Sequence, residues 1–243
     1  MKHFSILLVT IIFIGCQAVP KISVSHKTLL YDEGFEGFEN VTVESEIEIF
    51  ELNDEAKAFA QSAIRGVSKP KEQIQALVQH IFSRSDLNLL YRAEANTVAN
   101  QTFRNRAANC LSMSIMTYAL ANELGFSVRF QDIEIPEYWT IREGQSLLNG
   151  HINLQILPGS SRKRTQFLTQ GFEVDFDAQA TREHFPKTLL KLNQVVAMFH
   201  NNNGGDALLK KDYVKAYAYF RSAFLQSPNL SSVLTNLGYL YRL

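Results

Sequence analysis

The sequence predicts a mixed α+β fold followed by an all-helical region. Apolar residues recur at helical spacing between residues 70 and 82 and again between 110 and 124. Residues 126–135 and 151–157 instead alternate between apolar and polar types, which is typical of strands with one buried face. Beyond residue 200 the helical spacing returns and continues to the end of the sequence.

The first residues indicate a targeting segment. Met1-Lys2-His3 precedes the apolar run 4–14, which is too short to span a bilayer but suits the core of a signal peptide. Gly15-Cys16-Gln17 follows this run, and the whole segment resembles a bacterial lipoprotein signal, although Phe13 stands where a leucine is usual. We therefore predict a signal segment over residues 1–16.

The lipoprotein resemblance implies an anchor and a location. Cys16 becomes the lipidated mature N-terminus, and Gln17, in place of an aspartate, favours sorting to the outer membrane. The expected location is the bacterial cell envelope, with the protein held at the membrane by lipid and facing the periplasm. An ordinary secretory signal cleaved near Ala18, or an uncleaved anchor, is the alternative.

Composition excludes several classes of partner. The 24 Lys and Arg residues balance the 24 Asp and Glu residues, so no net charge attracts nucleic acid. The basic cluster 162–164 is expected to be a solvated hairpin turn. No metal, nucleotide or flavin motif is present, so we expect no metal and no cofactor. With Cys16 assigned to the lipid, Cys110 is expected to stay a free thiol.

The remaining sequence divides into three parts. We predict a loose linker over residues 17–38, a main domain over 39–180 and a helical region over 181–243. Within the main domain, residues 40–52 alternate among acidic neighbours and predict an edge strand. Asp54 is expected to cap a helix that runs to about residue 65.

Another helix is predicted to begin at Pro70, with one apolar face. His80 lies off that face and is expected to be exposed or partly hydrogen-bonded. The run 180–199 also predicts a helix, because its apolar residues recur at helical spacing.

Residues 97–177 carry the candidate chemistry. Cys110 opens an apolar helix that Gly125 ends, so the thiol lies in the first turn, where backbone N–H groups and the helix dipole stabilise a thiolate. A strand over 126–135 follows, and Pro136 to Trp139 is expected to break it. Two further strands are predicted, one beginning with His151 and one over residues 171–177 that contains Asp175.

The order Cys, His, Asp suits nucleophilic catalysis. An isolated thiol is only slightly ionised at neutral pH, and a neighbouring histidine can hold its proton as imidazolium. A carboxylate then fixes the tautomer of the ring. A cysteine at a helix start and a histidine on a strand can converge without depending on mobile loops.

Three segments resemble the transglutaminase-like core of many bacterial proteins: Arg106-Ala-Ala-Asn-Cys-Leu-Ser-Met-Ser-Ile-Met-Thr-Tyr, Gly150-His-Ile-Asn-Leu and Phe172-Glu-Val-Asp-Phe. The resemblance implies a papain-like fold, in which the nucleophile helix packs on an antiparallel sheet. It also implies Cys110 as nucleophile, His151 as general base and acid, and Asp175 as the residue that orients the histidine. Asn109 replaces a common glycine and Ile152 a common aromatic residue, so no substrate preference is carried over.

Several neighbouring residues have more than one interpretation. Asp177 competes with Asp175 because alternate residues of a strand face the same way, and Asp175 is preferred because it matches the family motif. Asn109 either helps to polarise a carbonyl oxygen or caps the helix. Tyr138 and Trp139 either wall a substrate cleft or cover an edge of the core. Both His184 and His200 are expected to be structural.

The last region resembles tetratricopeptide repeats. The residues at the repeat positions are Gly204, Tyr213, Ala216, Phe220, Ala223 and Pro228, and Gly238 recurs one period of about 34 residues after Gly204. One full repeat and one partial repeat are therefore predicted, forming an all-α helical hairpin. Because about three repeats are usually needed to bury a continuous face, the hairpin is expected to pack on the main domain unless the sequence is truncated.

Together, these resemblances imply an envelope thiol enzyme that attacks an amide bond of a peptide or protein, by peptidase- or amidase-like hydrolysis or by transamidation. The alternative is a catalytically silent scaffold that binds a protein partner through its repeat. The retained Cys110, His151 and Asp175 favour the enzyme.

Overall fold

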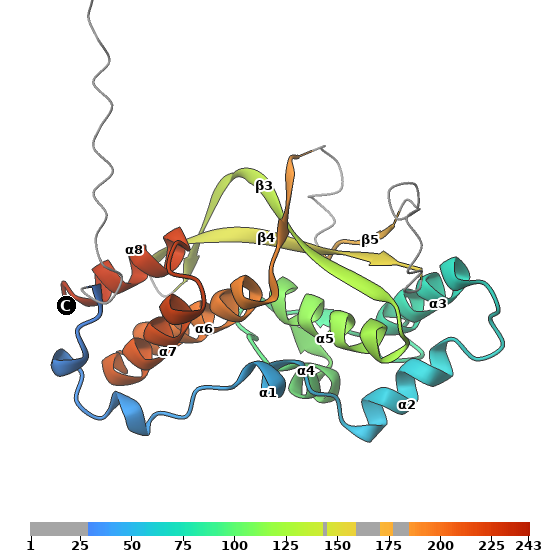
Figure 1. Cartoon of the computed structure of the whole chain (residues 1–243), viewed down its shortest axis with the longest axis horizontal. Helices are drawn as coiled ribbons and strands as arrows, with labels where there is room; N and C mark the ends of the chain where they lie inside the picture. Colours follow the sequence, from blue (N-terminus) through green and yellow to red (C-terminus); the bar gives the residue numbers. More distant parts are fainter. Residues whose placement is uncertain (1–28, 143–144, 159–170, 177–184) are drawn as a thin grey trace, which may run out of the picture. The chain divides into compact units, whose positions relative to one another are not determined.

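The computed structural model describes residues 29–142, 145–158, 171–176 and 185–243, with the backbone alone for 134–142 and 145–151. Residues 29–31 belong to an N-terminal unit, and residues 32–243 form one compact unit. That unit has a mixed α+β fold (Figure 1). No helix in these described ranges is long and apolar enough to cross a membrane.

The predicted edge strand over 40–52 is wrong, because these residues include a short helix, α1 (Glu46–Phe50). Ser45 and Glu48 form a capping box, in which the Ser45 hydroxyl accepts from the Glu48 amide and the Glu48 carboxylate accepts from the Ser45 amide. Ile49 is buried while Ile47 is 77% exposed, although a strand would place both on one face. The local hydrogen bonds of the cap therefore outweigh the alternating pattern.

The next two helices lie close to their predicted positions. Helix α2 (Asp54–Ala63) is capped by Asn53 and not by Asp54, since the Asn53 Oδ1 accepts from the Ala56 amide at 2.8 Å. Helix α3 (Pro70–Phe82) begins at the predicted proline. His80 lies outside its buried face, and its Nδ1 is 3.1 Å from an Asp86 carboxylate oxygen.

A small parallel sheet and a short helix precede the cysteine helix. Strand β1 (Leu90–Tyr91) pairs with β2 (Ala107–Ala108), and α4 (Ala99–Asn105) lies between them in the sequence. Helix α5 (Cys110–Glu123) then begins at the predicted residue. It ends just before Gly125, whose φ of 79° is a left-handed conformation that suits glycine.

The main sheet is antiparallel and has the strand order β5-β4-β3-β6. Its strands are β3 (Ser127–Arg142), β4 (Gln145–Leu157), β5 (Phe172–Val174) and β6 (Lys187–Leu190).

The sheet corrects two expectations. Strand β3 does not end at Pro136; instead, its register with β4 shifts between Ile133 and Tyr138. Proline lacks the N–H that the ladder needs, so it interrupts the pairing without ending the strand. The helix predicted over 180–199 is confirmed from Leu192 onward and is wrong over Lys187–Leu190, because Leu189 and Leu190 pair with β3 as part of β6.

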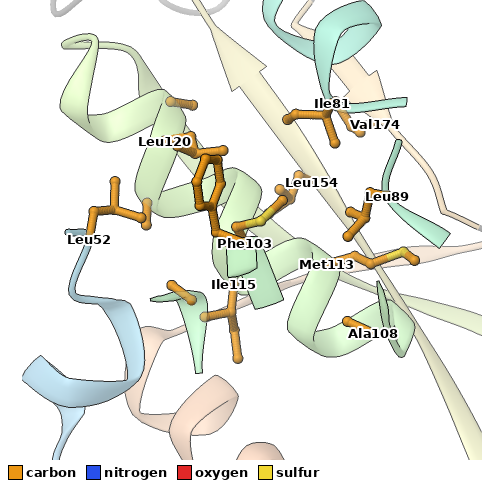
Figure 2. Close-up of a cluster of buried hydrophobic side chains, with 14 of the residues drawn as sticks. Leu52, Ile81, Leu89, Phe103, Ala108, Met113, Ile115, Leu120, Leu154 and Val174 are labelled. Carbon is orange, nitrogen blue, oxygen red and sulfur yellow. The ribbon is translucent and has the colours of Figure 1, made fainter. Parts of the chain in front are cut away.

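Helix α5 packs against this sheet and forms the centre of the core. The Tyr118 ring of α5 stacks on Phe130 of β3 with 4.7 Å between ring centroids. Leu120 of α5 and Leu154 of β4 are fully buried members of the same cluster, part of which is shown in Figure 2. Helices α1, α2 and α4 also contact α5 (Figure 1). The cysteine helix is therefore enclosed along most of its length.

Three helices form the C-terminal part: α6 (Leu192–Leu209), α7 (Tyr213–Gln226) and α8 (Ser231–Leu240). Gly204 of α6 lies so close to Phe220 of α7 that a Cβ atom at residue 204 would come within 2.6 Å of the ring. The start of α6 belongs to the main core, since Val195 and Phe199 are buried in the same cluster as α5. The helical hairpin thus packs on the rest of the compact unit.

Candidate functional site

Cys110 is the first residue of α5, and it is a partly exposed free cysteine that packs against the core. The helix begins here because Asn109 has an extended backbone and caps the first turn. The Asn109 side-chain oxygen accepts from the Ser112 amide at 2.9 Å, and its backbone oxygen accepts from the Met113 amide at 2.9 Å. The Cys110 amide precedes these bonds and has no acceptor within the helix. Cys110 therefore lies in the turn whose N–H groups have no acceptor within the helix.

Of the two roles considered for Asn109, the structure shows the helix cap. Its side chain is 8% exposed, and its Nδ2 donates to the Asn96 Oδ1 at 3.2 Å. The cap uses the Asn109 Oδ1, and the bond to Asn96 uses one of the two Nδ2 hydrogens. The oxyanion role of the Asn109 side chain stays a prediction that these contacts do not support.

His151 lies in β4, where its Cα atom is paired with Ile133 of β3. The structure describes the backbone of this residue but not its side chain. The prediction that His151 is on a strand is confirmed, and α5 packs against the same sheet, but β4 begins at Gln145 and not at His151. No geometry between the imidazole and the thiol is part of the described structure.

The lengths of α5 and β3 bear on the predicted approach of His151 to Cys110. Strand β3 returns along α5 after the turn at Gly125, and Tyr118 and Phe130 mark a common level. From Tyr118 back to Cys110 the helix spans about 12 Å. From Phe130 to Ile133, the partner of His151, the strand spans about 10 Å. The two lengths are similar, which agrees with the predicted approach of His151 to Cys110, and that approach stays a prediction.

Asp175 follows the last residue of β5 and is partly buried. Its neighbours anchor it: Val174 is buried opposite Leu154 of β4, and Phe176 packs on Phe82 with 5.6 Å between ring centroids. The register of β4 and β5, continued by one residue, brings Asp175 to the level of Asn153, two positions from His151. Residues at such diagonal positions are separated by about 7–8 Å between Cα atoms.

Tyr138 and Trp139 lie in strand β3 and not in the predicted loop. Their Cα atoms pair with Asn149 and Leu148 of β4, two and three residues before His151. Only the backbone of these two aromatic residues is described, so neither of their proposed roles is decided.

Other predicted residues fall outside the part of the chain that the structure describes. These are Cys16, Asp177 and His184. His200, predicted to be structural, is buried on α6 and hydrogen-bonded on both ring nitrogens.

Sequence reasoning missed the asparagines around the helix start. Asn96 precedes α4 and contacts Asn109, while residues 201–203 form an asparagine run in the middle of α6. Asparagine is a poor helix former and competes for backbone hydrogen bonds, so three in a row were a usable signal. A polar cavity of about 380 Å³ lies beside these residues, lined in part by Glu44, Asn96 and Asn203.

The described residues contain no group of three or more His, Cys, Asp or Glu side chains arranged to hold a metal ion. Comparisons with protein-family models, with curated proteins and with solved structures find no match for this chain.

Proposed function

We propose that the protein is a thiol enzyme that attacks amide bonds, with Cys110 as nucleophile, His151 as general base and acid, and Asp175 as the orienting carboxylate. The proposal includes a transglutaminase-like, papain-like core and a C-terminal tetratricopeptide hairpin formed by α6 and α7. The observation that carries it is the position of Cys110 in the first turn of α5, the helix that packs on the antiparallel sheet bearing His151.

Two further features support this proposal. Cys110 is partly exposed although ten residues of α5 are buried, so the residue keeps contact with solvent on a helix that is fixed by the core. His151 lies in β4, and Asp175 directly follows β5, the strand that pairs with β4. A nucleophile on a rigid helix and a base on a rigid strand suit a reaction that depends on accurate positioning.

In the proposed reaction, the Cys110 thiolate attacks the carbonyl carbon of the amide while His151 holds the thiol proton. The carbon–nitrogen bond then breaks, and the imidazolium gives that proton to the leaving amine, which leaves a thioester on Cys110. In the second step, His151 takes a proton from water as the water attacks, and the carboxylic acid departs as the thiol is regenerated. A second amine in place of water would give transamidation.

The remaining parts of the proposal concern location and partners. A lipid on Cys16 would hold the protein in the bacterial envelope, where peptide and protein amides are the available substrates. Close packing of Gly204 on Phe220 supports the repeat hairpin, because small residues at this position let the paired helices approach. A protein partner bound at the hairpin belongs to the same proposal.

The decisive experiment is the alkylation of Cys110 by iodoacetamide as a function of pH, in protein without residues 1–16. An ordinary thiol loses more than about a hundredfold of its rate between pH 9 and pH 6, because only the thiolate reacts. We expect a loss of less than about tenfold in the wild type, since an imidazolium keeps the thiolate at pH 6. In His151→Ala, the ordinary loss should return.

The matched control is His80→Ala, which removes a histidine that bonds to Asp86 far from α5 in the sequence. This variant should keep the wild-type profile, and Cys110→Ser should remove the signal. If the pH profile of Cys110 alkylation is the same in the wild type and in His151→Ala, the proposed charged pair of Cys110 and His151 is contradicted. The scaffold would then be favoured, and partner binding through α6 and α7 would be measured in its place.

A further inference from the structure

A chain of asparagine side chains connects the cap of the cysteine helix to α6. The Asn109 Nδ2 donates to the Asn96 Oδ1 at 3.2 Å, and the Asn96 Nδ2 donates to the Asn203 Oδ1 at 3.0 Å and to the Phe199 carbonyl at 3.1 Å. The Asn202 Nδ2 also lies 3.4 Å from the Asn96 Oδ1. Both ends of the Asn96 amide are thus bonded, on one side to the start of α5 and on the other to α6.

The backbone beside Asn96 makes the same connection. The Asn109 amide donates to the Ala95 carbonyl at 2.9 Å, and the Thr97 amide donates to the Ser112 hydroxyl at 2.8 Å. Residues 95–97 therefore hold the first turn of α5 through three separate hydrogen bonds. Because Asn96 is half-buried and Asn109 is 8% exposed, these bonds are partly shielded from competing water.

We propose that Asn96 is a positioning residue for Cys110, through which the helical hairpin of α6 and α7 holds the first turn of α5. The hairpin is then part of the machinery that sets the reactivity of the thiol. Any ligand that moves α6 relative to residues 95–97 would change the reactivity of the thiol. The reason is that the Asn96 side-chain amide bonds both to α6 and to the Asn109 cap. The catalytic meaning of this link rests on the proposed function, whereas the link itself does not.

Two readouts test the proposal in protein without residues 1–16. The first is the hydrogen exchange of the Ser112 amide, which the Asn109 cap protects. The second is the ratio of Cys110 alkylation rates at pH 9 and pH 6. In Asn96→Ala we expect exchange to become faster by up to about fivefold, the factor that corresponds to the complete loss of one helix cap. We expect the rate ratio to rise several-fold, because a frayed first turn stabilises the thiolate less.

Variants of Asn203 provide a milder test if Asn96→Ala folds poorly. Asn203→Ala removes one acceptor of Asn96 and should change both readouts in the same direction, while Asn203→Asp keeps an acceptor oxygen and should stay close to wild type. Asn193→Ala is the matched control, because Asn193 is also on α6 but donates to the Gln226 carbonyl of α7, away from the cap. It should change neither readout.

The outcomes separate this proposal from the proposed function. If folded Asn96→Ala and Asn203→Ala keep the wild-type rate ratio, Asn96 does not position the thiol, whether or not exchange changes. The effect of His151→Ala on the same ratio reports on the charged pair alone. A ratio that responds to Asn96→Ala but not to His151→Ala would support the link and refute the catalytic pair.

Discussion

Burial determines the chemistry of His200, which lies on α6 with 2% of its surface exposed. Its Nε2 is 2.9 Å from the Glu44 carbonyl oxygen, which can only accept, so Nε2 carries the proton. Nδ1 then accepts from the Ser222 hydroxyl at 3.0 Å. The neutral ring satisfies both partners, and a second proton would displace the Ser222 donor. Burial also lowers the pKa of His200, although the Glu44 hydrogen bond opposes this shift.

This environment predicts a pH dependence of stability. Because the pKa of His200 is lower in the folded state than its ordinary value of 6.5, the unfolded chain binds the proton more readily. The contribution of the neutral ring is complete above about pH 6.5 and is lost as pH falls through the folded pKa. The ceiling for one proton is about 1.4 kcal/mol per pH unit. We expect the free energy of unfolding in urea to fall more between pH 7.5 and pH 5.5 in the wild type than in His200→Gln.

His80→Gln is the comparison for this measurement. The His80 ring is half-exposed and lies 3.1 Å from Asp86, so this variant replaces a histidine without changing a buried one. Equal pH slopes for the wild type and His200→Gln would show that the buried ring does not control stability in this range.

At the scale of single residues, the sequence identified the thiol but not its support. Cys110 could be placed in the first turn because an apolar helical period begins there and ends at Gly125. Asn96 could not be assigned a role, because its partners lie 13 and 107 positions away in the sequence. Local patterns reveal a helix start, whereas contacts between distant side chains depend on the complete fold.

At the scale of elements, the two adjacent glycines of α6 have opposite surroundings. A Cβ atom on Gly204 would lie 2.6 Å from the Phe220 ring, which is itself fully buried. A Cβ atom on Gly205 would meet nothing within 4 Å. Both glycines weaken the helix by their conformational freedom, but only Gly204 is required by the close approach of α6 and α7.

Substitution of these two glycines should therefore change stability in opposite directions. Gly204→Ala forces the buried Phe220 ring to move and should destabilise by about 1–3 kcal/mol, as overpacking usually does. Gly205→Ala adds a better helix former in open space and should stabilise by about 0.5–1 kcal/mol. Urea unfolding followed by circular dichroism checks both. A Gly204→Ala protein as stable as Gly205→Ala would mean that the two helices are not tightly packed.

The elements predicted correctly are those with a long, unambiguous period. Helices α3 and α5 and the start of β3 follow directly from periodicity. The predictions for residues 40–52 and 185–191 were wrong, because short apolar runs fit a helix and a strand equally well. In the first the Ser45 capping box decides for a helix, and in the second pairing with β3 decides for a strand. Only the second of these deciding interactions lies far away in the sequence.

At the scale of the whole compact unit, residues 32–44 attach to the helical hairpin. Asp32 accepts from Tyr217 at 2.6 Å and from two nitrogens of Arg221 at 2.8 and 3.2 Å. Phe35 stacks on Tyr217 with 4.3 Å between centroids, and the Arg221 guanidinium lies 4.9 Å from the centre of the Phe38 ring. The last residues of the predicted linker are thus held against α7. Composition predicted a loose segment here. It could not reveal the attachment, because the partners lie about 180 residues further along the chain.

Aromatic packing is expected to hold this attachment more strongly than the ion pair. The Asp32 side chain is 44% exposed, and exposed pairs contribute about 0–1 kcal/mol. Phe35 and Tyr217 stack in parallel, which contributes about 0.5–1.5 kcal/mol beyond the apolar area that the ring removes from water. We expect Phe35→Ala to destabilise by about 2 kcal/mol, and the coupling between Asp32→Ala and Arg221→Ala to stay below about 1 kcal/mol.

Acid should separate these two contributions. The Arg221 hydrogen bond holds the pKa of Asp32 below its ordinary value of 3.8. The stabilising effect of the pair is therefore complete above that value and is lost as pH falls through the lowered pKa of Asp32. A double-mutant cycle at pH 7 and at pH 3, followed by urea unfolding, should show the coupling decline in acid while the cost of Phe35→Ala stays constant. A coupling that exceeds the Phe35→Ala cost at pH 7 would reverse this order and make the ion pair the main attachment of the segment.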